Sequence, residues 1–183
     1  IFPGQGSQKT GMGRELYEHY PAARKLLERA SEEMELDFAA LLFEPDERLS
    51  RSEYTQPAVM LTSLMALRVF EAHSDLRPEI AFGHSLGEFT ALACAGALED
   101  VKGLRLVRER GRLMQAAGEG KAYGMMAVLG LPDAAVEEFC EQRRQSGLQV
   151  WPANYNCEGQ MVIAGVREDL QACEAPLKEQ GAK

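Results

Sequence analysis

The sequence of 183 residues has no surplus of basic side chains, no long apolar run and no internal repeat. Its formal net charge is −8, whereas nucleic-acid-binding proteins normally carry a basic surplus, so we expect no nucleic-acid partner. No apolar stretch approaches the length of a membrane-spanning helix, so we expect no membrane partner. The composition, 45% hydrophobic, suits one globular domain with or without a smaller second domain.

Cysteines are few, and their spacing matches no metal-binding pattern. Cys94, Cys140, Cys157 and Cys173 are widely scattered and form no C-x-x-C pair. We therefore expect reduced, mostly buried thiols in a cytoplasmic protein, with no bound metal.

One tight glycine motif, "GHSLG" at 83–87, fits the pattern G-x-S-x-G. It stands between a short apolar segment, 78–84, and an alanine-rich stretch that continues to Ala97. This pattern often places a nucleophilic serine on a strained turn between a strand and a helix. We therefore predict that Ser85 is a nucleophile and that the N–H of Leu86 stabilises an oxyanion. A chance match is the alternative, because the motif is short.

Histidine is scarce, and none follows Ser85 in the chain. A serine hydroxyl is a poor nucleophile until a base takes its proton. His84 is adjacent to Ser85 and should project in a different direction on a sharp turn, while His19 and His73 are expected at the surface. The residues by themselves leave the base unassigned.

Arg110 is unusual in the helix predicted over 100–117. Residues three, four and seven positions away share its face of a helix, and all are apolar or small. A buried guanidinium needs a carboxylate or several acceptors. Arg110 therefore predicts either a structural ion pair or a fork that grips a substrate carboxylate. The residues that define its face are Gly103, Leu106, Val107, Leu113, Met114 and Ala117.

The amino-terminal stretch "PGQGSQ" at 3–8 is a third candidate element. Its glycines let the backbone approach a ligand, and Gln5 could donate its amide N–H to an oxyanion. A phosphate-binding loop is the rival interpretation, but the G-x-x-x-x-G-K-[ST] pattern is absent.

The first part of the chain reads as an α/β core. A loop is expected over 43–57, and Pro57 should lie in the first turn of the buried helix that begins near Gln56. The segment 78–84 should form a central strand. Helices are predicted over 14–34, 56–73, 85–97 and 100–117.

The second part predicts the order β-α-β-β-α, which lacks one strand of a ferredoxin-like unit. Its last helix contains Pro176, which should kink or shorten it. We therefore divide the chain into domains 1–121 and 122–183. We expect the missing strand to follow Lys183, and we expect the strand that opens the chain to begin before Ile1.

Five stretches in order resemble the malonyl-CoA:acyl carrier protein transacylases of fatty acid synthesis. The resemblance implies an α/β fold: a hydrolase-like core with a short parallel sheet and a nucleophile elbow, plus an inserted, here incomplete, ferredoxin-like α+β subdomain. It implies ping-pong transfer of malonyl from coenzyme A to a serine, and then to the phosphopantetheine thiol of acyl carrier protein. The matching stretches are "FPGQGSQ" at 2–8, "TQPA" at 55–58, "GHSLGE" at 83–88, "RGRLMQ" at 110–115 and "NYNCEGQMVIAG" at 154–165.

Carried onto matching positions, the resemblance implies Ser85 as nucleophile and Gln5 with the Leu86 N–H as oxyanion hole. It implies that Arg110 clamps the malonyl carboxylate, which agrees with the argument from the helix face. The partners would be malonyl-CoA and acyl carrier protein, with no cofactor. The base would be a histidine after the small subdomain's last strand, expected beyond Lys183. Cys157 departs from the family, which often has serine there, and little consequence is expected.

Three alternatives remain open. The chain could be the acyltransferase domain of a polyketide synthase, or a serine hydrolase, which would not need Arg110 on a buried face. It could also be a catalytically incomplete fragment that serves as an interaction module. An acidic carrier protein would require a local basic surface, for which the candidates are Lys102, Arg105, Arg108 and Arg112, or Arg143 and Arg144.

Overall fold

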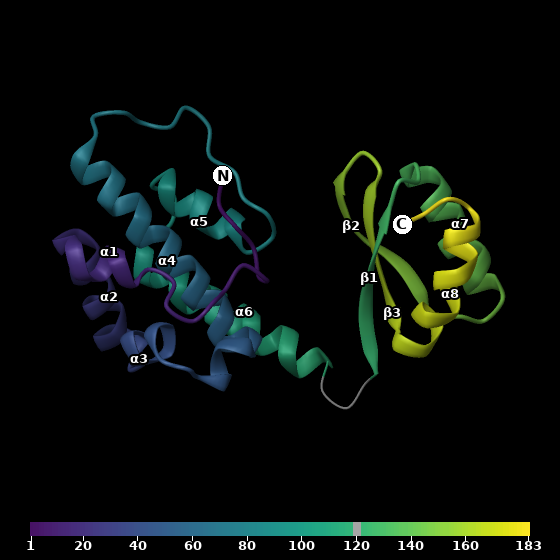
Figure 1. The fold of residues 1–183 in the computed structure, drawn as a ribbon, viewed down its shortest axis with the longest axis horizontal. Helices are drawn as coiled ribbons and strands as arrows, with labels where there is room; N and C mark the ends of the chain where they lie inside the picture. The colour runs from purple at the N-terminus through teal and green to yellow at the C-terminus, as the bar shows by residue number, and fades with distance from the viewer. Residues whose placement is uncertain (119–121) are drawn as a thin grey trace. The chain divides into compact units, whose positions relative to one another are not determined.

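A computed structural model describes residues 1–118 and 122–183 of the chain (Figure 1). The chain divides into two compact units, Ile1–Ala117 and Gly118–Lys183. Each unit has its own apolar core. The boundary predicted from the sequence, between 121 and 122, touches residues that lie outside the described ones.

Helix α4 (Ser52–His73) runs through the core of the larger unit. It is buried on most sides because four helices contact it: α1 (Arg14–His19), α2 (Pro21–Met34), α3 (Phe38–Phe43) and α5 (Gly87–Cys94). The predicted loop over 43–57 is wrong in its second half. A short 3-10 helix, η1 (Glu47–Ser50), leads directly into α4, and the Thr55 hydroxyl donates to the Leu49 carbonyl at 2.6 Å. Pro57 therefore lies inside α4 and not in its first turn.

The helix predicted over 14–34 is two helices, α1 (Arg14–His19) and α2 (Pro21–Met34). Tyr20 separates them in an extended conformation, with φ −123° and ψ 115°. Pro21 causes the break, because a proline disfavours the helical conformation in the residue before it. Helix α3 (Phe38–Phe43) was not predicted, and Asp37 caps it by accepting from the Ala40 N–H at 2.9 Å.

Helices α5 (Gly87–Cys94) and α6 (Asp100–Gly118) complete the larger unit. Two glycines of α6 face α4 at close range. A Cβ atom on Gly103 would lie 2.5 Å from Met60 Cε, and one on Gly111 would lie 2.3 Å from the Ser52 carbonyl oxygen. At Gly111 the Ser52 backbone leaves no room for a side chain, whereas at Gly103 the space is filled by the flexible end of Met60. The absence of a side chain at Gly111 lets α6 approach the start of α4 closely.

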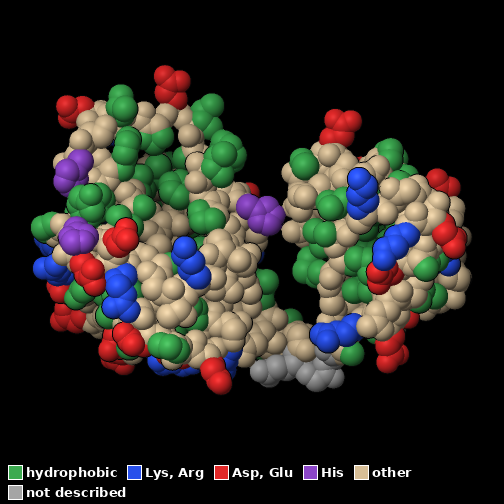
Figure 2. Space-filling view, viewed as in Figure 1, with side chains coloured by type: hydrophobic (Ala, Val, Ile, Leu, Met, Phe, Trp, Pro, Cys, Tyr) green, Lys and Arg blue, Asp and Glu red, His purple; other side chains and the backbone are tan. Residues whose placement is uncertain are grey.

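The central strand predicted over 78–84 is reduced to one parallel bridge between Phe2 and Gly83. Phe2 N–H donates to the Phe82 carbonyl at 2.9 Å, and His84 N–H donates to the Phe2 carbonyl at 3.2 Å. Within the described residues no second strand covers this segment, so Ile80 is 79% exposed and Phe82 56% exposed. Hydrophobic side chains at the surface of the larger unit are visible in Figure 2.

The smaller unit is an antiparallel sheet of order β1-β3-β2. Helices α7 and α8 both lie on one side of it (Figure 1). The predicted order β-α-β-β-α is therefore confirmed, although Pro176 does not shorten α8. Leu129 and Lys183 exchange both backbone hydrogen bonds, which is the pairing of antiparallel strands. The elements are β1 (Tyr123–Leu129), α7 (Asp133–Gln145), β2 (Val150–Cys157), β3 (Gln160–Val166) and α8 (Arg167–Glu179).

All four cysteines are free thiols. Cys140 and Cys173 are buried, Cys94 is half-buried and Cys157 is exposed. Burial raises the pKa of the Cys140 thiol to about 11, so it stays protonated at neutral pH. Among the described residues, no helix combines the length and the apolar character needed to span a membrane.

Gly111→Ala tests the close approach of α6 to α4. The helix propensity of alanine favours this change by about 1 kcal/mol. We nevertheless expect the free energy of unfolding to fall by about 2 kcal/mol, because the new Cβ would meet the Ser52 backbone. Chemical denaturation of both proteins measures the difference. Gly118→Ala, in the same helix with nothing within 4 Å of its Cβ, is the matched control and should not destabilise. Equal effects at both positions would contradict the packing.

Candidate active site

Ser85 occupies a tight turn that only glycine neighbours permit. Its φ is +52°, in the left-handed region that side chains other than glycine rarely adopt. A Cβ atom on Gly83 would lie 2.1 Å from the Gly87 carbonyl carbon, and one on Gly87 would lie 2.3 Å from the Phe2 carbonyl oxygen. The structure thus forms the strained turn that the motif predicts, and it leaves Ser85 exposed.

The Leu86 N–H stands next to Ser85 at the amino end of α5. The following N–H groups are used within the turn, because Gly87 donates to the His84 carbonyl at 2.9 Å and Glu88 to the Ser85 carbonyl at 3.2 Å. No backbone carbonyl of the described residues accepts from Leu86 N–H. The helix end adds partial positive charge. This N–H can therefore stabilise negative charge that develops beside Ser85.

Arg110 contacts the serine directly. Its Nη2 donates to Ser85 Oγ at 2.9 Å, and its Nη1 donates to Gln56 Oε1 at 2.8 Å. Its Cζ lies 5.7 Å from the centre of the Phe89 ring. Residues that are distant in sequence, on α4, α5 and α6, therefore converge on one guanidinium.

The face predicted for Arg110 is only partly correct. Gly103 and Val107 are buried, but Leu106, Leu113 and Met114 are about half exposed, and Ala117 is also exposed. The buried stripe of α6 is centred on the residues that pack against α4, so it is rotated away from these apolar side chains. Arg110 lies at the edge of that stripe and is half-buried.

Gln5 joins the same group of polar side chains. Its Nε2 donates to Ser52 Oγ at 3.0 Å, and its Oε1 accepts from Gln56 Nε2 at 3.3 Å. Gln56 and Ser52 were not predicted as site residues. The signal for Gln56 was present, since it is a polar residue at the head of an apolar helical run, but only tertiary contacts show what it meets.

Arg110 differs from its neighbours on α6 in its charge partners. Arg105 forms an ion pair with Glu33, Arg108 with Glu53, and Arg112 with Glu109. In residues 1–118 and 122–183, no ion pair includes Arg110. The structural ion pair considered from the sequence is therefore not formed among them, and the positive charge of Arg110 remains available to a ligand.

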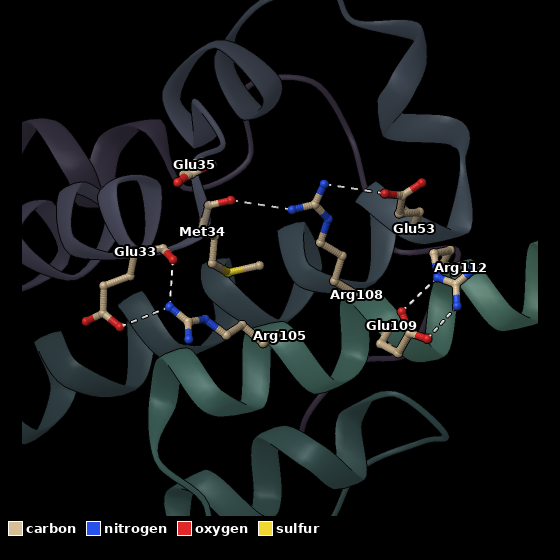
Figure 3. Close-up of a pocket in the computed structure, with 8 residues that line it drawn as sticks. All are labelled: Glu33, Met34, Glu35, Glu53, Arg105, Arg108, Glu109 and Arg112. Atoms are coloured by element: carbon tan, nitrogen blue, oxygen red, sulfur yellow. Dashed lines mark hydrogen bonds and ion pairs between the residues drawn. The ribbon is translucent and has the colours of Figure 1, made fainter.

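The paired arginines line a separate groove of about 400 Å³ (Figure 3). Residues two positions apart on a helix point about 200° apart, so Arg108 and Arg112 face away from Arg110. Neither Ser85 nor Gln56 lines the groove. Its arginines pair with Glu33, Glu53 and Glu109, and Glu35 also lines it. The groove is thus an ion-pair cluster distinct from the serine site.

The structure gives two of the three histidines clear local contacts. His73 Nδ1 lies 2.8 Å from the Val69 carbonyl oxygen, and its ring packs edge-on against Tyr20. A Cβ atom on Gly4 would lie 2.9 Å from His84 Nδ1, so the His84 ring lies against the Gly4 backbone. His19 is exposed at the end of α1. Among the described residues, no group of three or more His, Cys, Asp or Glu side chains is placed to hold a metal ion.

A serine on a strained turn is suited to acyl transfer when a guanidinium contacts its oxygen and the N–H beside it has no backbone acceptor among the described residues. The chain belongs to the acyl transferase domain family, which matches residues 1–183. Its α/β fold with the small antiparallel sheet matches part of the fold of solved transacylase structures, with TM-scores of 0.91 and 0.93.

Within this family, the chain is similar to proteins named as malonyl-CoA:acyl carrier protein transacylases. The chain is 41% identical over 184 residues to a malonyl CoA-acyl carrier protein transacylase of Bacillus subtilis strain 168, covering 100% of this chain and 58% of that protein. The malonyl-CoA:acyl carrier protein transacylase structure of Helicobacter pylori is 44% identical with TM-score 0.91, covering 100% of this chain and 58% of that one.

A third match is a solved complex of a type II polyketide synthase acyl-carrier protein with its malonyl-transacylase. It is 37% identical with TM-score 0.90, covering 100% of this chain and 59% of that one. This chain therefore spans somewhat more than half the length of the curated relatives it matches.

The left-handed conformation of Ser85 can be tested by stability alone. Ser85→Gly and Ser85→Ala both remove the hydroxyl, but only glycine adopts φ +52° without strain. We expect the glycine variant to have the higher free energy of unfolding, by about 1 kcal/mol. The control is Ser146, where φ is −84°. There glycine should be less stable than alanine, and the same order at both positions would contradict the turn.

Proposed function

We propose that the whole protein transfers a malonyl group from coenzyme A to the phosphopantetheine thiol of an acyl carrier protein, through a malonyl ester on Ser85. The observation that carries the proposal is Arg110, a half-buried guanidinium 2.9 Å from Ser85 Oγ with no carboxylate partner in the described residues. Relatives named for this reaction support the same function.

The first step forms a C–O bond and breaks a C–S bond. Ser85 Oγ attacks the thioester carbonyl carbon of malonyl-CoA and gives its proton to a base. The tetrahedral intermediate then collapses and expels the thiolate of coenzyme A, which takes that proton from the base and leaves as the thiol. The second step is the reverse with a different thiol, so the carrier thiol leaves as the malonyl thioester and Ser85 regains its proton. Neither step changes an oxidation state, and neither needs a cofactor.

The Leu86 N–H would stabilise the oxyanion of each tetrahedral intermediate. It lies next to the nucleophile and has no backbone acceptor among the described residues. Gln5 is proposed as the second donor through its amide, which now donates to Ser52 Oγ at 3.0 Å. The amide would exchange that exposed contact for the oxyanion, whose charge makes it the stronger acceptor.

Arg110 would bind the free carboxylate of the malonyl group. In a malonyl group, one methylene separates the carboxylate carbon from the thioester carbon. A guanidinium that touches Ser85 Oγ is therefore near enough to reach both oxygens of the carboxylate. A bidentate pair of this kind fixes orientation as well as charge. A substrate such as acetyl-CoA, which has no carboxylate, would leave the charge unmatched.

The base that takes the Ser85 proton must be a group other than Arg110. A guanidinium cannot accept the serine proton, because it stays charged. We assign the base to the histidine that the resemblance places after the last strand of the smaller unit, and not to His84.

The surface that would bind the carrier protein is predicted from the sequence alone. Arg105, Arg108, Arg112 and Arg144 already pair with carboxylates, which an acidic partner would have to displace.

The complete protein exposed briefly to malonyl-CoA should gain the mass of one malonyl group. Intact-mass spectrometry detects the adduct, which should be absent in Ser85→Ala and should be lost when a carrier protein bearing phosphopantetheine is added. No adduct on the complete, folded protein would contradict the proposal. Release of free malonate well above transfer to the carrier would indicate a serine hydrolase instead.

Arg110→Ala should lower the activity with malonyl-CoA but not with acetyl-CoA. We expect kcat/KM for malonyl-CoA to fall by about 100-fold or more, because a charge-assisted bidentate contact is lost. Transfer from acetyl-CoA should be unchanged or improved, because it never used that contact. Steady-state assays with both thioesters measure the ratio. Arg105→Ala is the control in the same helix: any loss through the candidate carrier surface should be equal for the two substrates and leave their ratio unchanged. An equal loss with both substrates would show that Arg110 is only structural.

A further inference from the structure

Gln56 is a fully buried amide, 0% exposed, beside Arg110. Burying an amide is unfavourable unless its polar atoms find partners, so its partners indicate its role. Its Oε1 accepts from Arg110 Nη1 at 2.8 Å, a short bond to a charged donor. Its Nε2 has longer contacts of 3.3 Å, to Gln5 Oε1 and to the weak acceptor Met114 Sδ. The bond to Arg110 is therefore its principal interaction.

We propose that Gln56 is a positioning residue that orients Arg110 and thereby makes the site selective for acyl groups that carry a carboxylate. This inference rests on the proposed function. A long arginine side chain loses much rotamer freedom when it is held in one place. With Gln56 on Nη1 and the Phe89 ring beside Cζ, Nη2 is directed at Ser85 Oγ.

The choice of an amide at position 56 matters for the charge. Three other arginines of α6 are each neutralised by a glutamate, in the pairs Arg105–Glu33, Arg108–Glu53 and Arg112–Glu109. A neutral amide oxygen orients Arg110 as a carboxylate would, but it leaves the positive charge uncancelled. The charge is then matched only when a substrate carboxylate arrives. Gln56 thus fixes the position of the guanidinium without competing with the substrate carboxylate for its positive charge.

Gln56→Met in the complete protein is the first test. Methionine has a similar length and suits a buried helix, but its thioether is a poor acceptor for Arg110. We expect kcat/KM for malonyl-CoA to fall about 10- to 100-fold, the usual effect of losing one charge-assisted hydrogen bond, and to fall mainly through KM. Transfer from acetyl-CoA should fall less, because it does not use Arg110, so the malonyl-to-acetyl ratio of kcat/KM should fall. A cooperative thermal unfolding transition like that of the unaltered protein shows that the variant is folded.

Gln56→Glu is the second variant, because it keeps the shape of the side chain and its contact with Arg110. Its carboxylate would compete with the malonyl carboxylate, so the malonyl-to-acetyl ratio should again fall about tenfold or more. Thr55→Val is the matched control. Thr55 is also fully buried, in the same helix, but its hydroxyl donates to the Leu49 carbonyl, so the ratio should not change.

A double-mutant cycle distinguishes positioning from general structural damage. In an Arg110→Ala background, Gln56→Met should have no further effect on the malonyl-to-acetyl ratio, because its effect passes through Arg110. An equal loss for both substrates in Gln56→Met, or an unchanged ratio in Gln56→Glu, would overturn the inference while the Ser85 and Arg110 results still stood. If Arg110→Ala itself left the ratio unchanged, the carboxylate clamp of the proposed function would fail, and the inference would fail with it.

Discussion

The candidate site depends on the close packing of α6 against the first turns of α4. That packing is possible because Gly111 has no side chain where the Ser52 backbone passes. One turn further along α4, Gln56 is then within 2.8 Å of Arg110, and Arg110 within 2.9 Å of Ser85. A larger residue at position 111 would separate the helices, so a packing constraint with no chemistry of its own sets the geometry of the polar group.

The turn at Ser85 is held by a second set of close contacts. The Phe2 backbone pairs with the segment around Gly83, and its carbonyl oxygen lies where a Cβ on Gly87 would be. The left-handed conformation costs about 1–3 kcal/mol, and it persists because these neighbours and the buried Leu86 side chain leave no alternative. Strain at the serine is thus offset by packing around it, which keeps its hydroxyl exposed.

Sequence patterns predicted the long elements well and the short ones poorly. The span of α6 and the β-α-β-β-α order of the smaller unit followed from periodicity and turn residues. The break at Tyr20 was missed although Pro21 signals it, and α3 is too short for a periodic pattern. The segment 78–84 looked like a buried strand because it is apolar. Its burial depends on neighbouring strands, and within the part of the chain that the structure describes only Phe2 pairs with it.

For the site, the sequence by itself determined the residue types at the turn. Gly83 is required locally, because its Cβ would meet the Gly87 backbone, whereas the need for glycine at position 87 comes from the Phe2 carbonyl and is tertiary. The sequence also marked Arg110 as unusual, but it misplaced the buried face of α6 by treating every apolar neighbour as core. Only the tertiary structure decided that Arg110 has an amide and not a carboxylate as its partner. That contact joins residues 54 positions apart, and no local pattern encodes which helices meet.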